Sequence, residues 1–273
     1  MSENAAKNNN TQEFKNVKYL LTSSMRTLIL VVLYNDKKNL NEIRNELQKP
    51  SATILHGLKE LEENNLIKKD RKYYELTSNG YLLATNIIKL IENWHSIEKN
   101  KLFWNNHDLS GIPENFLNKL YLLKDAQFIS STTSDLSNAF NKYVELISSS
   151  NELTIILPIY SENHFKYLIK QLKNNEMTQL TILINSKILQ TMKQSRYLKK
   201  SLIENENVRI FETEKNLKIF LTYSTDFMAL TLFFKDNHYD DSQIIIATDK
   251  SAIKWSKELF KDYMRSDNNE RKE

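Results

Sequence analysis

The feature that most constrains this chain is Pro50, which separates two short helical patterns close to the N-terminus. Apolar residues recur at helical spacing over residues 17–34 and again over residues 40–47, where Asn39 is placed as an N-cap. Pro50 cannot continue the second of these helices, and Ser51 is a good cap for a third helix that runs to about residue 64. We therefore predict two short helices joined by a tight turn.

A β-hairpin and a long helix are expected after the third helix. Residues 66–69 and 73–76 form two short extended runs, and the polar residues 70–72 separate them. Thr77 or Ser78 then caps a helical pattern that extends to about residue 100. Helix, helix, tight turn, helix, hairpin and helix is the element order of a winged helix-turn-helix, which we predict for residues 15–80.

The third helix has two chemically different faces. At 100° per residue, Ile54, Leu58 and Leu61 fall on one side of it, which we expect to pack. The opposite side is expected to be free to contact a partner. Its members are Ala52, Leu55, His56 and Lys59.

The free face and the hairpin carry side chains suited to double-stranded DNA. His56 can donate to a guanine or a phosphate, Leu55 offers an apolar contact to a thymine methyl, and Lys59 suits the phosphate backbone. Ser51, at the positive end of the helix dipole, is placed to bind a phosphate. The hairpin supplies a basic run that suits phosphates or a minor groove, consisting of Lys68, Lys69, Arg71 and Lys72. A solvated basic turn and a surface histidine are the ordinary interpretations of the same residues.

Composition excludes several classes of protein. The 38 Lys and Arg against 34 Asp and Glu give a net charge of +4, which is too mild for an architectural DNA-coating protein. Cysteine is absent, and the five histidines show no metal-binding spacing, so we expect no disulfide, metal or cofactor. No run approaches 18 apolar residues and no secretory signal is evident, so we expect a cytoplasmic protein without a membrane partner.

The second half of the chain changes character after residues 111–113, where Gly-Ile-Pro makes the clearest break. We expect residues 81–111 to form a connecting or dimerisation helix and linker, and residues 112–265 a C-terminal domain. Strand and helix patterns alternate to residue 184, which indicates βαβ units. Four later extended runs, the first at residues 208–211, look antiparallel. The fold class is therefore α+β or α/β, with a mixed sheet in the C-terminal domain.

The long helix bears a broad apolar stripe. Its members are Leu83, Ile87, Leu90, Ile91, Trp94 and Ile97. Such a stripe either pairs two copies of the chain or packs on the C-terminal domain. We expect a homodimer, because two linked winged helices read two half-sites with increased affinity.

Residues 20–80 resemble the winged-helix domains of ArsR-like prokaryotic regulators, in segments such as SSMRTLIL at 23–30 and YELTSNG at 74–80. Residues 112–263 resemble the C-terminal half of the archaeal methanogenesis-regulator family, in LTIILPIY at 153–160, LTILIN at 180–185 and AIKWSKELFKDY at 252–263. The family pattern tends to have glycine where this chain has Asn237 and Ser256. The resemblance implies a transcription regulator of a methanogenic archaeon that binds DNA as a dimer.

A regulator of this kind is expected to bind a small-molecule or protein effector in its C-terminal domain. In open α/β sheets, ligands lie beyond the carboxyl ends of the strands. Strand ends and family-matching segments together indicate a hypothetical pocket, whose residues are Pro158, Tyr160, Asn185, Ser186, Tyr239, Asp240 and Trp255. Ordinary packing and turn formation are the competing interpretation.

An enzyme is the alternative hypothesis for the C-terminal half. His164 and Lys166 resemble the HxK element of phospholipase D-like hydrolases, but Gln171 stands where those enzymes have aspartate, and no second copy is present. We therefore expect no catalytic residues and no enzymatic activity.

Overall fold

A computed structural model describes residues 17–174 and 177–270 and divides the chain into two compact units that meet between Glu92 and Asn93. This division lies inside helix α5 (Ser78–Lys99), earlier than the break expected at residues 111–113. Residues 93–111 belong to the second unit because Phe103 and Trp104, on α6 (Lys101–Asn106), are buried in its core.

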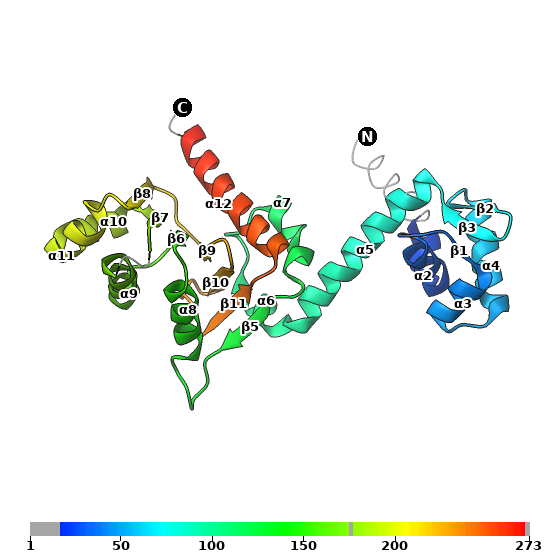
Figure 1. The fold of residues 1–273 in the computed structure, drawn as a ribbon, viewed down its shortest axis with the longest axis horizontal. Helices are drawn as coiled ribbons and strands as arrows, with labels where there is room; N and C mark the ends of the chain where they lie inside the picture. The colour runs from blue at the N-terminus through cyan, green and yellow to red at the C-terminus, as the bar shows by residue number, and fades with distance from the viewer. Residues whose placement is uncertain (1–16, 175–176, 271–273) are drawn as a thin grey trace, which may run out of the picture. The chain divides into compact units, whose positions relative to one another are not determined.

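The first unit has the element order of a winged helix-turn-helix (Figure 1). After a helical segment at residues 17–21, its elements are α2 (Ser24–Val32), β1 (Lys38–Asn39), α3 (Leu40–Leu47), α4 (Ser51–Glu63), β2 (Ile67–Asp70), β3 (Tyr73–Leu76) and the start of α5. Asn39 caps α3 in a complete capping box with Glu42, as its place in the sequence predicts. The tight turn after α3 is made by Gln48, whose backbone is left-handed.

Two sequence predictions for this unit need correction. The single helix expected over residues 17–34 is broken at Thr22 and Ser23, because the Ser23 side chain accepts a hydrogen bond from the Arg26 amide and starts α2 anew. The hairpin has a third strand, since β1 pairs antiparallel with β3. Two residues are too short a run to show the period of a strand.

The second unit is a mixed sheet with helices on both faces. Its strands are β4 (His107–Asp108), β5 (Gln127–Ser130), β6 (Glu152–Leu157), β7 (Gln179–Asn185), β8 (Val208–Thr213), β9 (Ile219–Tyr223), β10 (Met228–Phe234) and β11 (Gln243–Ala247). Its further helical elements are α7 (Glu114–Leu117), η1 (Leu120–Leu123), α8 (Asn138–Ser148), α9 (Glu162–Lys173), α10 (Ser186–Gln194), α11 (Arg196–Leu198), η2 (Lys199–Ile203) and α12 (Lys250–Glu270). The strand order is β5-β11-β10-β9-β6-β7-β8, with β4 paired to β10.

The sheet confirms the mixed fold class but differs from the expected pairing in two places. β6, β7 and β8 run parallel, so the run at 208–211, expected to be antiparallel, extends the parallel part. β5 does not adjoin β6; it pairs antiparallel with β11 at the other edge. Strand neighbours separated by long stretches of chain leave no local trace in the sequence.

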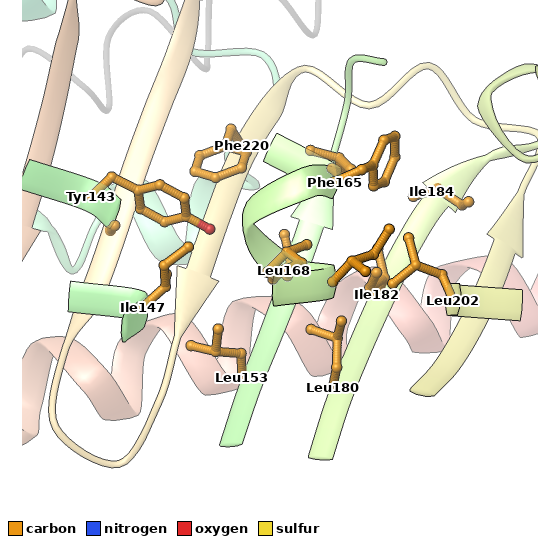
Figure 2. Packing of buried hydrophobic residues seen from close by; sticks show 14 of the residues in the cluster. Tyr143, Ile147, Leu153, Phe165, Leu168, Leu180, Ile182, Ile184, Leu202 and Phe220 are labelled. Atoms are coloured by element: carbon orange, nitrogen blue, oxygen red, sulfur yellow. The ribbon is translucent and has the colours of Figure 1, made fainter. Parts of the chain in front are cut away.

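Strand alternation fills a core on each side of the sheet. In β6, Leu153, Ile155 and Leu157 face one cluster while Ile156 faces the other. Figure 2 shows part of the first cluster, where Phe165 and Leu168 of α9 pack over the strands. The second cluster contains Trp255 and other buried residues of α12. This two-sided burial explains why the strands read as nearly continuous apolar runs.

The two positions where glycine was expected accommodate other residues. Asn237 has φ of 69°, a left-handed conformation that asparagine tolerates. Ser256 is completely buried on α12, and its hydroxyl donates to the Ile253 carbonyl at 2.7 Å. The helix itself continues to Glu270.

Candidate nucleic-acid interface and candidate effector cavity

Helix α4 has the two faces that its sequence predicts. Ile54, Leu58 and Leu61 are at most 1% exposed and belong to the core of the first unit. Ala52, Leu55, His56 and Lys59 are all exposed, and the apolar Leu55 is 43% exposed. Burial of one face therefore fixes the helix while leaving the other free of contacts with the core.

The start of α4 differs from the expectation. Pro50, and not Ser51, is the N-cap, and no side chain caps the helix. The Pro50 carbonyl accepts from the amides of Thr53 and Ile54, and Ser51, half-buried, is the first helical residue. The uncapped start presents backbone N–H groups and the positive end of the helix dipole, which suit a phosphate.

Carboxylates accompany the polar side chains of α4. His56 Nε2 lies 3.8 Å from Glu60 Oε1, and Lys59 Nζ lies 3.8 Å from Glu63 Oε1. Glu60 also binds Arg26, whose Nη1 donates to Glu60 Oε2 at 2.9 Å. These long, exposed contacts of His56 and Lys59 are weak, so a nucleic acid can replace them at small cost.

The turn of the hairpin is exposed and has an unusual backbone at Arg71. Its φ of 55° is left-handed, a conformation that favours glycine. Arginine at this position carries a backbone cost at the tip of the hairpin. The hairpin tip thus carries a positive charge at a position where glycine would fit the backbone better.

The four basic residues of the hairpin are not equivalent. Lys68 pairs with Glu75 at 2.9 Å across the strands. Lys69, Arg71 and Lys72 have no carboxylate partner within the part of the chain that the structure describes. Lys69 and Lys72 lie 5.4 Å and 5.5 Å from the ring centres of Tyr74 and Tyr73, which leaves their ammonium groups available to phosphates.

Sequence reasoning missed two residues near these surfaces. Lys37 precedes β1 and lies 5.7 Å from the Tyr73 ring centre, so it adds a cation to the hairpin. Thr53 is exposed on α4 beside Ala52. Lys37 becomes a neighbour of the hairpin only through the pairing of β1 with β3, which the sequence does not reveal.

The second unit contains a cavity of about 300 Å³ between α8, α9 and the strands β9, β10 and β11. Four aromatic residues line it: Phe140, Tyr143, Phe220 and Tyr239. His164 lines it as well, and of the described Asp, Glu, Lys and Arg residues Asp241 alone lies in the lining. The volume is at the low end for a small-molecule site.

A buried hydrogen-bond chain forms one wall of this cavity. The Tyr143 hydroxyl lies 3.1 Å from His164 Nε2 and 3.1 Å from Thr222 Oγ1. Burial lowers the pKa of His164 to about 4. Burial also raises the pKa of the Tyr143 and Tyr239 hydroxyls. All three groups are therefore uncharged at neutral pH.

The low pKa of His164 predicts a loss of stability in acid. Its pKa is 6.5 when unperturbed and about 4 in the folded chain, so between these values the unfolded state binds the proton more readily. The free energy of unfolding should therefore fall by on the order of 3 kcal/mol as the pH falls from 6.5 to 4. Urea denaturation at several pH values measures this loss, which His164→Gln should reduce. The exposed His95→Gln is the control and should leave the loss as in the parent.

The structure does not bring the seven expected effector residues together. Tyr239 lines the cavity, and Pro158 and Tyr160 flank the lining residue Ile159. The other four are elsewhere in the unit: Asn185 N-caps α10, Ser186 bonds to Glu214, Asp240 is buried beside His107, and Trp255 donates to the Phe116 carbonyl at 3.2 Å. Tyr143, His164 and Phe220 were missed as cavity residues, because α8, α9 and β9 meet only in three dimensions.

His107 and Asp240 form a buried pair next to the cavity. His107 Nε2 lies 3.0 Å from Asp240 Oδ2, and its Nδ1 lies 2.6 Å from the Phe103 carbonyl. The two ring nitrogens of His107 are therefore both engaged, one by a carboxyl group and one by a backbone carbonyl. Asp240 also accepts from Ser242 and from the cavity residue Gln243.

Two family models match most of the chain. The model described as the N-terminal domain of the methanogenesis regulatory protein FilR1 matches residues 14–94. The model described as the middle domain of the same protein matches residues 136–266. The chain belongs to the FilR1 family of methanogenesis regulatory proteins. The resemblance found in the sequence is thereby confirmed at the level of this family.

FilR1 of Methanothrix harundinacea (strain 6Ac) is 27% identical to the chain over 252 residues. The match covers 91% of this chain and 56% of that protein, so the chain spans about half the length of this curated FilR1. The match does not include the remaining part of that protein or any activity that depends on it.

Solved structures give weaker similarities to this FilR1-family chain. TrmBL2, an archaeal chromatin protein, is 14% identical with a TM-score of 0.40, over 88% of this chain and 91% of its own. Quinone-bound YodB from B. subtilis is 25% identical with a TM-score of 0.29, over 30% of this chain and 94% of its own. The family assignment depends on the two domain models and not on these scores.

The hydrolase hypothesis finds no support in the FilR1-family chain. His164 is 5% exposed and bonded to Tyr143, whereas Lys166 is exposed and pairs with Glu162 at 2.9 Å. The Gln171 amide donates to Ser148. Two residues apart on α9, His164 and Lys166 point in different directions and form no joint site.

Among residues 17–174 and 177–270, no three His, Asp or Glu side chains are grouped as metal ligands would be. In the same described residues, no helix combines the length and apolarity needed to cross a bilayer.

Proposed function

We propose that this FilR1-family protein is a sequence-specific, DNA-binding transcription regulator of an archaeon and has no enzymatic activity. The observation that carries the proposal is the division of α4, whose aliphatic side is sealed in the core while Leu55 and His56 are exposed. On this account Leu55 and His56 contact base edges in a major groove. Ser51, Ala52 and Lys59 contact the adjoining backbone.

The hairpin supplies sequence-independent affinity in this proposal. Lys69, Arg71 and Lys72 bind phosphates, and Lys68 joins them when it exchanges Glu75 for DNA. Each phosphate contact adds about 0.9 to the slope of log affinity against log salt. In this proposal α4 determines which sequences are preferred, and the hairpin determines most of the salt dependence of binding.

Selection of duplexes from a random library, followed by a salt series, tests the proposal. A regulator should prefer the selected duplex over its scrambled version by three orders of magnitude or more at about 0.15 M salt. A non-sensing architectural protein would bind both duplexes alike with a steep salt dependence. Equal binding of the two duplexes would contradict the proposed regulator.

We also propose that the protein acts as a homodimer through α5. Leu90, Ile91 and Trp94 are 58%, 49% and 61% exposed on this helix, and Ile87 precedes them at helical spacing. Large apolar side chains exposed in succession on one helix are typical of an interface.

The dimer is tested by the mass in solution. Sedimentation equilibrium at micromolar concentration should give twice the 32.2 kDa chain mass. Leu90→Lys with Trp94→Lys should return the mass to that of one chain, because two like charges would face each other across the interface. Lys89→Glu with Glu98→Lys also changes exposed residues of α5 and should leave the dimer intact. A parent that sediments as a monomer would contradict the proposal.

The second unit is proposed to bind the effector. The aromatic cavity between α8, α9 and the sheet supports this role, because its polar and apolar lining and its volume of about 300 Å³ suit a small molecule. Gln243 belongs to this cavity and donates to Asp240 at 2.9 Å. Ligand binding at the cavity is therefore adjacent to the His107–Asp240 pair and, through Phe103, to α6.

A further inference from the structure

The cavity of the second unit has the walls of an aromatic box. The rings of Tyr143 and Phe220 lie 5.4 Å apart at 78°, and those of Phe220 and Tyr239 lie 6.4 Å apart at 76°. Nearly perpendicular rings are arranged as adjacent walls of a box, and Figure 2 shows Tyr143 beside Phe220 over the sheet. Phe140 lines the cavity as a fourth ring.

The hydroxyl groups of this box are already engaged. Tyr143 uses its hydroxyl on His164 and Thr222. Tyr239 has a hydrogen bond with Thr231, which opposes the effect of burial on its pKa. A ligand therefore meets the rings of these tyrosines more than their hydroxyls, and the faces of aromatic rings carry partial negative charge.

The charged side chains that line the box have one sign. Among residues 17–174 and 177–270, no lysine or arginine lines the cavity, whereas Asp241 does. His164 adds no positive charge at neutral pH, because burial holds its pKa near 4. The negative charges of Asp241 and Asp240 both act on Tyr239. An anionic ligand would enter this cavity without a counter-charge, while a cation would find rings and a carboxylate.

We propose that this cavity binds a small organic cation, of the quaternary ammonium or alkylammonium class, held by Tyr143, Phe220 and Tyr239 with Asp241 as the counter-charge. The inference rests on the proposed effector-binding role of the second unit and names the chemistry of its ligand. Aromatic rings arranged around a cavity with a nearby carboxylate recognise this class through cation–π attraction. The volume of about 300 Å³ suits a small ligand.

The test compares a cation with its uncharged analogue of the same shape. Choline has a quaternary nitrogen at the position where 3,3-dimethylbutan-1-ol has a quaternary carbon, so the two molecules differ in charge but hardly in shape. Isothermal titration of the full chain at neutral pH should show choline binding at least about ten-fold more tightly than the neutral analogue. Equal or tighter binding of the neutral analogue, or no binding of either at millimolar concentration, would overturn the proposal.

Matched variants locate the binding. Tyr239→Leu should abolish the preference for choline, whereas Tyr239→Phe keeps the ring and should preserve it. Asp241→Asn should weaken choline several-fold without changing the affinity for the neutral analogue. Asp226→Asn removes an exposed carboxylate outside the cavity lining and should have no effect.

A failed cation test and a failed regulator are distinguishable. Selected and scrambled duplexes are bound by the same protein preparation, so a chain that discriminates between them but ignores choline refutes the ligand class alone. A chain that binds choline with the expected variant pattern but does not discriminate between duplexes supports the ligand class and refutes the regulator. Unchanged choline affinity in Tyr239→Leu would also refute the proposed site.

Discussion

A variant with Arg71→Gly and Lys72→Gln is expected to bind every duplex about 30-fold more weakly per protomer at about 0.15 M salt, if both residues contact phosphates. This figure is the effect of two contacts, each with a slope of about 0.9, between a reference of about 1 M salt and about 0.15 M salt. The slope itself should fall by about 2. Sequence preference should be nearly unchanged, because the hairpin contacts the backbone.

The choice of glycine at position 71 separates binding from folding. Arg71 has φ of 55°, so glycine removes the charge and relieves the backbone at once. The hairpin should therefore remain folded, or gain stability, while affinity is lost. Fluorescence anisotropy with labelled duplexes over a salt series measures both quantities.

A second variant controls for net charge. Lys142→Gln with Lys254→Gln also removes two positive charges, from exposed positions of the second unit. It should leave the slope close to that of the parent. An equal loss in both variants would show that overall charge, and not the hairpin, provides the affinity.

His107→Ala is expected to lower the free energy of unfolding of the second unit by about 3–5 kcal/mol. The change leaves the carboxyl group of Asp240, which is 2% exposed, without its partner on the His107 ring. It also empties a space between two aromatic rings, since His107 stacks on Phe103 at 4.1 Å and on Phe234 at 4.8 Å. Urea denaturation followed by the fluorescence of the buried tryptophans measures the loss.

Replacing both members of this buried pair should be less damaging than removing one. His107→Leu with Asp240→Asn keeps an apolar ring-sized group and amide partners for Ser242 and Gln243, so part of the loss should be recovered. His238→Ala is the control, because His238 is exposed and its contact with Asp236 lies at the surface. A His107→Ala chain as stable as the parent would contradict a stabilising role of the buried pair.

The winged helix-turn-helix was predictable because its determinants are local. Pro50 ends one helix pattern, Asn39 caps α3, and the spacing of Ile54, Leu58 and Leu61 fixes the buried side of α4. Each of these signals lies within a few residues of the structure that it determines.

The second unit was less predictable because its determinants are remote in the chain. His107 and Asp240 are 133 residues apart, and the Tyr143 hydroxyl meets a threonine 79 residues away. The strand order that brings Phe220 beside Tyr143 also joins distant segments. Composition and hydrophobic periodicity identify these strands, but no local sequence pattern indicates which strands pair with one another.

The most direct test of base recognition by α4 uses a double variant, Leu55→Ala with His56→Ala. Its affinities for the selected and the scrambled duplex are compared with those of the parent over the same salt series. Leu55 and His56 are exposed, so the fold should be unaffected. The ratio of the affinity for the selected duplex to that for the scrambled duplex is expected to fall by at least ten-fold. The slope of log affinity against log salt should stay the same. An unchanged ratio in this variant would show that α4 does not read the bases.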